Sequence, residues 1–199
     1  MSKSEDAARQ KEIVEAAANV LVHYGLSALP YDLIAAEAGT TRQQIRKFYP
    51  DPDDLLSDLC NTVSRWYDEI LDRELASISK TKHLEFLLNF YFSVPSGQVA
   101  QRRQDDMVID ALLALSAKFE GVKEELIAHY QNTQQRIAKA IKAAHRDIKP
   151  KKCDEIGFQI VCLFFGHCKM VASLNFSPDY CSVSRAAADR LVAACSAAT

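Results

Sequence analysis

The sequence predicts an all-α protein, and three observations lead to that prediction. Alanine and leucine are plentiful among the 199 residues, whereas glycine and proline number only six each. This composition favours helices, because glycine and proline weaken a helix interior more than any other residues. Apolar residues recur every three or four positions along most of the chain, and no segment alternates convincingly as a β-strand would. We expect about nine helices.

The first predicted helix is defined by its apolar spacing. Apolar residues between Ile13 and Tyr24 recur at steps of three and four, which gives one apolar face, and we expect this helix to stop at Gly25. Pro30 then suits the first turn of a short second helix over residues 31–38, because a proline there loses no helical hydrogen bond.

A third short helix and a long fourth helix follow. Gly39 ends the second helix, since glycine accepts the left-handed backbone that is common at helix C-termini. Thr41 can cap a third helix that runs to about Phe48. Pro52 can open a long helix from Asp53 to about Ser77, whose apolar residues lie on one face.

The rest of the chain divides into further helical segments at glycines and prolines. Gly121 is expected to separate two helices, and Ser177 with Pro178 breaks the chain before the last one. The segment 153–176 is apolar around most of its circumference, which predicts burial on several sides. The expected helices are 83–92, 99–119, 122–146, 153–176 and 182–197.

Charge and hydropathy exclude several classes of protein. The net charge is −2, so nothing global demands a nucleic-acid partner and any DNA-binding surface must be local. The N-terminus has no apolar signal-peptide core, and the apolar run 160–166 is far too short to span a bilayer. We therefore expect a cytoplasmic protein with no membrane partner, whose six cysteines are reduced thiols.

The sequence carries no motif that points to catalysis or to a metal. HExxH, GxSxG, P-loop and GxGxxG patterns are missing, and Glu125 with His129 is one pair where a di-iron bundle needs two. Cys162, His167 and Cys168 can be imagined as metal ligands, but free cysteine is more often a small buried hydrophobe. We expect no enzyme, no cofactor and no metal site.

Residues 34–49, IAAEAGTTRQQIRKFY, have the pattern of a helix-turn-helix. The small Ala35 lets two helices approach, Gly39 allows a tight corner, and Ile45 folds back on Ile34. The polar residues of the second short helix then face outward. Arginine and glutamine pair bidentately with guanine and adenine in the major groove, where the start of such a helix usually makes contact. A plain surface corner with solvated charges is the alternative.

In this setting the chain resembles the tetracycline-repressor-like (TetR) family of bacterial regulators. The matching motifs are VLVHYG at 20–25, IAAEAGTTRQQIRKFY at 34–49 and PDPDDLL at 50–56. The resemblance implies a dimeric transcription regulator, usually a repressor, that binds palindromic double-stranded DNA, its operator. It implies a helix-turn-helix DNA-binding domain over residues 1–52 and a helical domain for an unknown small-molecule effector and for dimerisation over residues 53–199. The recognition helix implied by the resemblance runs from Thr41 to Lys47.

The expected DNA contacts lie on and beside this third helix. Three positions depart from the family pattern: Pro30 and Arg46 replace a threonine and a tyrosine that contact phosphate, and Pro52 replaces a lysine. Aspartates around Pro52 would repel the DNA backbone, which leaves a second hypothesis open. It is a helical ligand-binding or adaptor protein whose helix-turn-helix no longer binds DNA tightly. The expected DNA-binding residues are Thr40, Thr41, Arg42, Gln43, Gln44, Arg46, Lys47 and Tyr49.

The second half of the chain is expected to hold a ligand pocket and the dimer interface. Aromatic-rich pockets with a few polar groups bind drug-sized ligands, although ordinary core packing is the alternative for each aromatic residue. The narrow apolar faces of the last two helices favour a homodimer built from two helices of each subunit, as in the family that the chain resembles, and a monomeric core is the alternative. The expected pocket residues are Phe86, Phe90, Met107, Tyr130 and Phe158.

Overall fold

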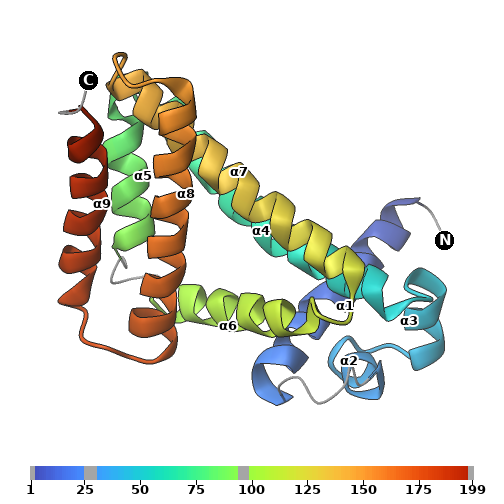
Figure 1. The fold of residues 1–199 in the computed structure, drawn as a ribbon. Coiled ribbons are helices and arrows are strands. Elements are labelled where there is room, and N and C mark those ends of the chain that lie inside the picture. Colours follow the sequence, from blue (N-terminus) through green and yellow to red (C-terminus); the bar gives the residue numbers. More distant parts are fainter. Residues whose placement is uncertain (1–2, 25–30, 94–98, 197–199) are drawn as a thin grey trace. The chain divides into compact units, whose positions relative to one another are not determined.

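The computed structural model describes residues 3–24, 31–93 and 99–196, and every regular element in these ranges is helical (Figure 1). The predicted all-α class is confirmed. The elements are α1 (Lys3–Tyr24), α2 (Tyr31–Glu37), α3 (Arg42–Phe48), α4 (Pro52–Ala76), the 3-10 helix η1 (Lys80–Lys82), α5 (His83–Phe92), α6 (Val99–Leu115), α7 (Glu120–Ala144), α8 (Pro150–His167), the π-helical segment η2 (Cys168–Ser173) and α9 (Tyr180–Ser196).

Several helix boundaries follow directly from residues that punctuate the sequence. α4 begins at Pro52 and α8 at Pro150, where the missing N–H of proline costs no helical hydrogen bond. Gly39 adopts the predicted left-handed backbone, with φ of 58°, between α2 and α3. The stop expected at Gly25 and the role expected of Pro30 lie outside the described residues.

The predicted boundary at Gly121 is wrong. α6 ends at Leu115, and Gly121 does not separate two helices but lies in the first turn of α7. Its N–H donates to the carboxylate of Asp53, which is distant in the sequence. A helix start fixed by such a distant acceptor leaves no local signal in the sequence.

The helix expected over residues 153–176 also differs. It is α-helical from Pro150 to His167 and then widens into η2. The N–H of Leu174 donates to the carbonyl of Lys169 at 3.0 Å, a bond that spans five residues as π-helical bonds do. Asn175 follows with φ of 56° and takes the chain out of the helix.

The chain packs as two compact units. Unit 1 comprises residues 1–66 and 107–127, and unit 2 comprises residues 67–106 and 128–199. Segments of α4, α6 and α7 belong to each unit. The domain boundary predicted at residue 52 divides the chain by expected function, whereas these units divide it by packing. The predicted boundary therefore stays a prediction.

Unit 1 is built around branched aliphatic side chains that its helices contribute. Ile13 of α1, Ile34 of α2 and Ile45 of α3 have no exposed surface, so α1, α2 and α3 share one core. Leu55 and Leu56 of α4 are buried as completely, and Leu112 of α6 is too. Burying side chains of this size stabilises the unit by roughly 1.5–3 kcal/mol each, before the entropy of ordering is subtracted.

Unit 2 has its own apolar core, in which α5, α8 and α9 lie side by side (Figure 1). Leu87 and Phe92 of α5, Ile141 of α7 and Ile160 of α8 are buried in it. Gly157 of α8 allows a close approach to α7, because a Cβ atom there would lie 2.8 Å from the carbonyl oxygen of Gln134. No described helix combines the length and the hydropathy that a membrane span requires.

Candidate nucleic-acid interface

The corner between α2 and α3 is fixed by backbone hydrogen bonds and by Gly39. The N–H of Thr40 donates to the carbonyl of Ala35 at 2.9 Å, and the N–H of Gly39 donates to Ala36 at 3.3 Å. A side chain on Gly39 would find open space, but the positive φ would strain any non-glycine residue. The tight turn predicted from the sequence is therefore present, and it orients α3.

The first turn of α3 is capped as predicted. The hydroxyl oxygen of Thr41 accepts the N–H of Gln44 at 3.2 Å, which satisfies one of the free donors at the helix start. The hydroxyl of Thr40 donates to the side-chain oxygen of Gln44. Ile45 anchors the opposite face of α3 in the core of unit 1. The helix thus has one buried residue and a solvent-facing polar surface.

The exposed face of α3 carries the charged side chains that the sequence assigned to DNA. Arg42, Gln43, Arg46 and Lys47 are all exposed. Arg42 pairs with Asp32 of α2 at 3.5 Å, and the two side chains are 50% and 76% exposed. A pair this long and this open contributes little, so Arg42 can exchange Asp32 for another partner at small cost.

Tyr49, one of the expected DNA-binding residues, is engaged inside unit 1. Its side chain is buried, with 4% of its surface exposed, and its hydroxyl donates to the carboxylate of Asp58 on α4. Burial and the hydrogen bond to Asp58 raise the pKa of Tyr49 above its ordinary value. The hydroxyl is thus engaged within unit 1, and this geometry gives no support to a phosphate contact.

The aspartates around Pro52 divide into two groups. Asp53 turns toward α7, where its carboxylate accepts the N–H of Gly121 at 2.9 Å and that of Val122 at 3.1 Å. Asp51 accepts the N–H of Asp53 at 2.9 Å and remains exposed, and Asp54 is exposed too. Only Asp51 and Asp54 of the three therefore add negative charge to the solvent-facing surface.

Cations and carboxylates of this surface lie within electrostatic reach of one another. Burial raises the pKa of the Tyr31 hydroxyl; the charges of Asp51 and Asp54 raise it further, while those of Arg46 and Arg42 lower it. All four charges therefore act on one hydroxyl. The surface is mixed in sign, with the cations concentrated on α3.

The expected ligand-pocket residues are placed in different surroundings. Phe86 and Phe90 stack on α5, with ring centroids 6.2 Å apart. Tyr130 packs edge-on against the rings of His129 and Phe165. Phe158 is 57% exposed on α8, and Met107 is exposed in unit 1. The structure thus brings Phe86 and Phe90 together, and the role of the set as a pocket stays a prediction.

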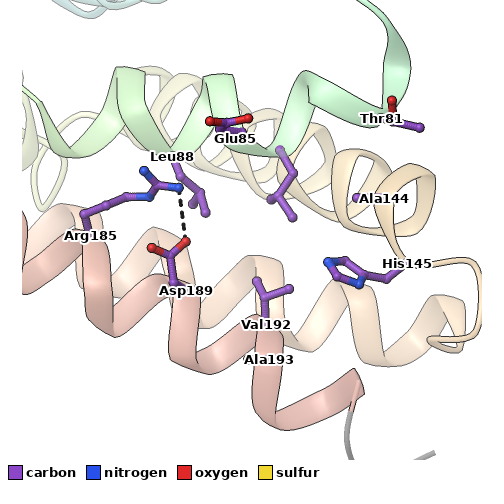
Figure 2. A pocket seen from close by; sticks show the side chains of 10 residues that line it. Thr81, Glu85, Leu88, Ala144, His145, Arg185, Asp189, Val192 and Ala193 are labelled. Atoms are coloured by element: carbon purple, nitrogen blue, oxygen red, sulfur yellow. Dashed lines mark ion pairs between the residues drawn. The ribbon is translucent and has the colours of Figure 1, made fainter.

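A small cavity of about 310 Å³ lies between α5, the end of α7 and α9 (Figure 2). Arg185 and Asp189, one turn apart on α9, form an ion pair at 3.1 Å along one wall, and Arg185 also donates to the side-chain oxygen of Asn89. Thr81, Glu85 and His145 complete its polar lining. Because its arginine is already matched by a carboxylate, this cavity favours no charged ligand strongly.

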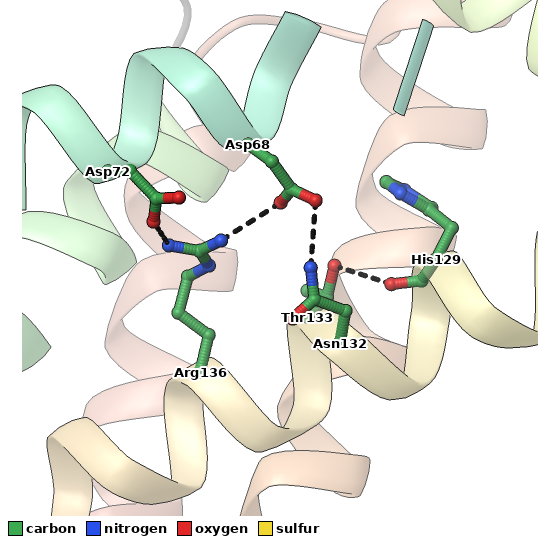
Figure 3. Close-up of polar contacts among 6 residues, drawn as sticks. All are labelled: Asp68, Asp72, His129, Asn132, Thr133 and Arg136. Carbon is green, nitrogen blue, oxygen red and sulfur yellow. Dashed lines mark hydrogen bonds and ion pairs between the residues drawn. The ribbon is translucent and has the colours of Figure 1, made fainter. Parts of the chain in front are cut away.

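A larger groove of about 800 Å³ lies elsewhere in unit 2, between the end of α4, the start of α5 and α7. Beside it Arg136 of α7 joins Asp68 and Asp72 of α4, and Asn132 donates to Asp68 at 2.8 Å (Figure 3). Sequence reasoning missed this cluster. The four-residue step from Asp68 to Asp72 was the available signal, since it places both carboxylates on one helix face.

Two other observations bear on catalysis and metals. Burial and the charge of Glu125 raise the pKa of the Cys60 thiol to about 11, so it stays protonated and unreactive at neutral pH. Within the described residues no group of three His, Cys, Asp or Glu side chains is arranged to hold a metal ion.

No protein-family model matches this sequence, and no curated protein shows significant similarity to it. Solved structures do match. A TetR transcription regulator from Haloarcula marismortui is 15% identical, with a TM-score of 0.75 over 95% of this chain and 98% of that one. A TetR-like transcriptional regulator from Rhodococcus sp. RHA1 is 18% identical, with a TM-score of 0.69 over 94% and 97% of the two chains.

A third match is the multidrug binding protein EbrR, solved in complex with imidazole. It is 16% identical, with a TM-score of 0.66 over 92% of this chain and 94% of that one. The fold and the exposed polar α3 define a helical protein with a helix-turn-helix. More particularly, the chain has the fold of the TetR-family transcriptional regulators.

Proposed function

We propose that this protein is a DNA-binding transcription regulator that uses α3 as its recognition helix. One observation carries the proposal: Arg42, Gln43, Arg46 and Lys47 are exposed together on a capped helix behind the Gly39 corner. Arginine and glutamine suit direct reading of bases, and lysine suits phosphate. The fold shared with transcriptional regulators supports this reading.

The finer part of the proposal is a homodimer on a palindromic operator. Large apolar side chains are exposed on α8, on α9 and on the segment that joins them, and a contiguous exposed apolar surface would suit a protein interface. A two-fold dimer would place two copies of α3 one helical turn of DNA apart, about 34–36 Å. The exposed set is Phe158, Met170, Leu174, Phe176, Tyr180 and Val183.

We further propose that the regulator is a repressor released by a small-molecule effector bound in unit 2. Two cavities described in that unit support this part, because both fall within the range of roughly 300–1,000 Å³ that known ligand sites occupy. EbrR, which shares the fold, was solved with a small molecule bound.

A second candidate is an adaptor whose helix-turn-helix binds DNA weakly. The ion pair between Arg42 and Asp32 and the exposed Asp51 and Asp54 favour it, because each carboxylate opposes an approaching phosphate. The two candidates differ in how strongly, and how selectively, the protein binds DNA.

Fluorescence anisotropy of the purified protein separates them. The protein is titrated against the DNA upstream of its own gene and against scrambled DNA, at two salt concentrations. A regulator binds the upstream DNA preferentially and loses affinity as salt rises, since it releases counterions from phosphates. Binding that is absent or indifferent to sequence at low salt, on this and on a random-sequence selection library, would favour the adaptor.

A further inference from the structure

The groove of about 800 Å³ in unit 2 has an apolar floor. Its volume falls within the range of roughly 300–1,000 Å³ that small-molecule sites occupy. The floor is supplied by the end of α4, the start of α5 and one face of α7. The apolar lining side chains are Leu75, Ala76, Ile78, Leu87, Ala140 and Ala143.

Three of the six polar residues that line the same groove are cations, and the other three are Asp72, His83 and Asn132. Lys80, Arg136 and Lys139 line it, and Asp72 is its single carboxylate. Arg136 and Lys139 are three residues apart on α7, so their side chains lie on one face. Lys80 and Lys139 are exposed and have no ion-pair partner within the described part of the chain. A local positive excess in a chain of net charge −2 attracts an anion to this place.

Arg136 is the least exposed of these cations and is only partly satisfied. Its side chain is 14% exposed, and its guanidinium contacts Asp68, 31% exposed, at 3.0 Å and Asp72, 68% exposed. Its Nε is buried without an acceptor within the described structure. The more solvated carboxylate, Asp72, is the easier one to displace, because it regains its hydration when it leaves.

We propose that this groove binds an amphipathic organic anion, with a carboxylate at Lys80, Lys139 and Arg136 and an apolar body along the floor. The carboxylate competes with Asp72 for the guanidinium of Arg136. A neutral apolar ligand would leave the two lysines unmatched, and a cation would be repelled by them. Binding does not depend on the function proposed above, whereas any effect on DNA rests on it.

The competition gives binding a structural consequence. Asp72 and Asp68 are the two residues of α4 that hold Arg136 of α7. Displacement of Asp72 removes one of the two ion pairs that Arg136 makes with α4. α4 is also the helix that follows the recognition helix α3 in the chain. An anion at Arg136 therefore acts on a helix that unit 1 also uses.

The first test is isothermal titration of the full chain with octanoate, octan-1-ol and octylammonium, which share a chain length and differ in charge. We expect one octanoate per chain and at least about tenfold weaker binding of the other two probes, since a carboxylate gains charge-assisted hydrogen bonds. Equal binding of the three probes, or no binding of octanoate, would overturn the proposal.

Variants locate the site. Lys80→Ala combined with Lys139→Ala is expected to weaken octanoate binding about tenfold or more, as loss of charge-assisted contacts does. The matched control, Lys118→Ala with Lys151→Ala, removes two exposed lysines outside the groove lining and should leave the affinity unchanged. Asp72→Asn removes the competing carboxylate and is expected to tighten binding. Equal effects of the two double variants would place the anion elsewhere.

A variant that keeps the charge unchanged tests whether the change in octanoate affinity comes from the groove itself rather than from the altered net charge. Ala143→Leu fills the floor at a partly exposed position, so it should fold and yet weaken octanoate binding. Circular dichroism confirms that each variant is folded, and unchanged binding by folded Ala143→Leu would contradict the site.

A last experiment adds octanoate to the complex of the protein with labelled DNA and follows DNA release by fluorescence anisotropy. If octanoate binds but the DNA is not released, the site stands and its regulatory role is wrong. If the protein binds no DNA at all, only the function proposed above is wrong.

Discussion

The carboxylate of Asp53 caps the first turn of α7, accepting the N–H of Gly121 at 2.9 Å. It also accepts the N–H of Val122 at 3.1 Å. A Cβ atom on Gly121 would lie 2.6 Å from the hydroxyl oxygen of Ser57 and 2.9 Å from Asp53, so glycine is what permits this approach. The contact joins two helix starts that are 68 residues apart in the sequence.

Asp53→Ala tests this cap. We expect a loss of about 1 kcal/mol in the free energy of unfolding, within the 0.5–2 kcal/mol measured for loss of a helix cap. Urea denaturation followed by circular dichroism measures it. Asp54→Ala is the control, since it removes an exposed acid from the same turn of α4. Equal losses in the two variants would mean that the charge of the α4 first turn matters and the cap does not.

Arg42 is expected to read bases. Arg42→Ala should cost about 1–3 kcal/mol at one operator position and relax specificity there, because a bidentate contact to a base edge is lost. Anisotropy against operators changed one base pair at a time measures this. Asp32→Ala should tighten binding slightly, since it removes the present partner of Arg42. An equal loss on every sequence would instead mark Arg42 as a phosphate contact.

Lys47 is expected to contact phosphate rather than bases. It is exposed on α3, with its ammonium 5.7 Å from the ring centre of Phe48. Lys47→Ala should weaken binding to all DNA and lower the slope of log K against log salt by about one, because one counterion fewer is released. Lys118→Ala, at an exposed lysine of unit 1 outside the helix-turn-helix, should leave the slope unchanged. An unchanged slope in Lys47→Ala would remove this residue from the interface.

Phe158 is expected to lie in a dimer interface. With 57% of its surface exposed on α8, it is the kind of apolar residue that a second copy would cover. Light scattering after gel filtration should give about twice the chain mass of 22.2 kDa for the natural protein and the single mass for Phe158→Glu. Leu113→Glu, at an exposed leucine of unit 1, is the control. A dimer that survives Phe158→Glu would exclude this residue from the interface.

His129 is expected to make stability depend on pH. Burial lowers its pKa below the ordinary value, the charge of Asp68 opposes this in part, and its Nδ1 is buried without a partner in the described structure. The unfolded chain takes up a proton near pH 6.5, whereas the folded protein resists it. Stability is therefore greatest above about pH 6.5 and falls as the pH drops toward the folded pKa, by at most about 1.4 kcal/mol per pH unit.

Denaturation at several pH values between 5 and 8 checks this prediction. His129→Gln should flatten the dependence below about pH 6.5, because the difference in proton binding at this position between the two states is gone. His23→Gln, at an exposed histidine of α1, is the control. An equally steep dependence in His129→Gln would assign the effect to other groups.

Sequence reasoning located most helices and much of the candidate interface because both depend on local signals. Thr41 caps α3 and Gly39 makes the corner, and each acts within four residues of its own position. The outward face of α3 follows from Ile45 alone, since one buried residue on a short helix leaves the others in solvent. The burial of Tyr49 was not expected from the sequence, because its acceptor, Asp58, lies on α4.

By itself the sequence determined the helical class, the positions of most helix boundaries and the polar surface of α3, since helical periodicity and capping act over one or two turns. Tertiary structure decided which carboxylates form hydrogen bonds or ion pairs inside the protein and which face solvent. The partners are far apart in the chain: Asp53 meets Gly121, and Arg136 meets Asp72 across 64 residues. Packing brings such pairs together and encloses the groove beside Arg136. The step from Asp68 to Asp72 indicates a shared helix face, but residue spacing does not identify the partner on another helix.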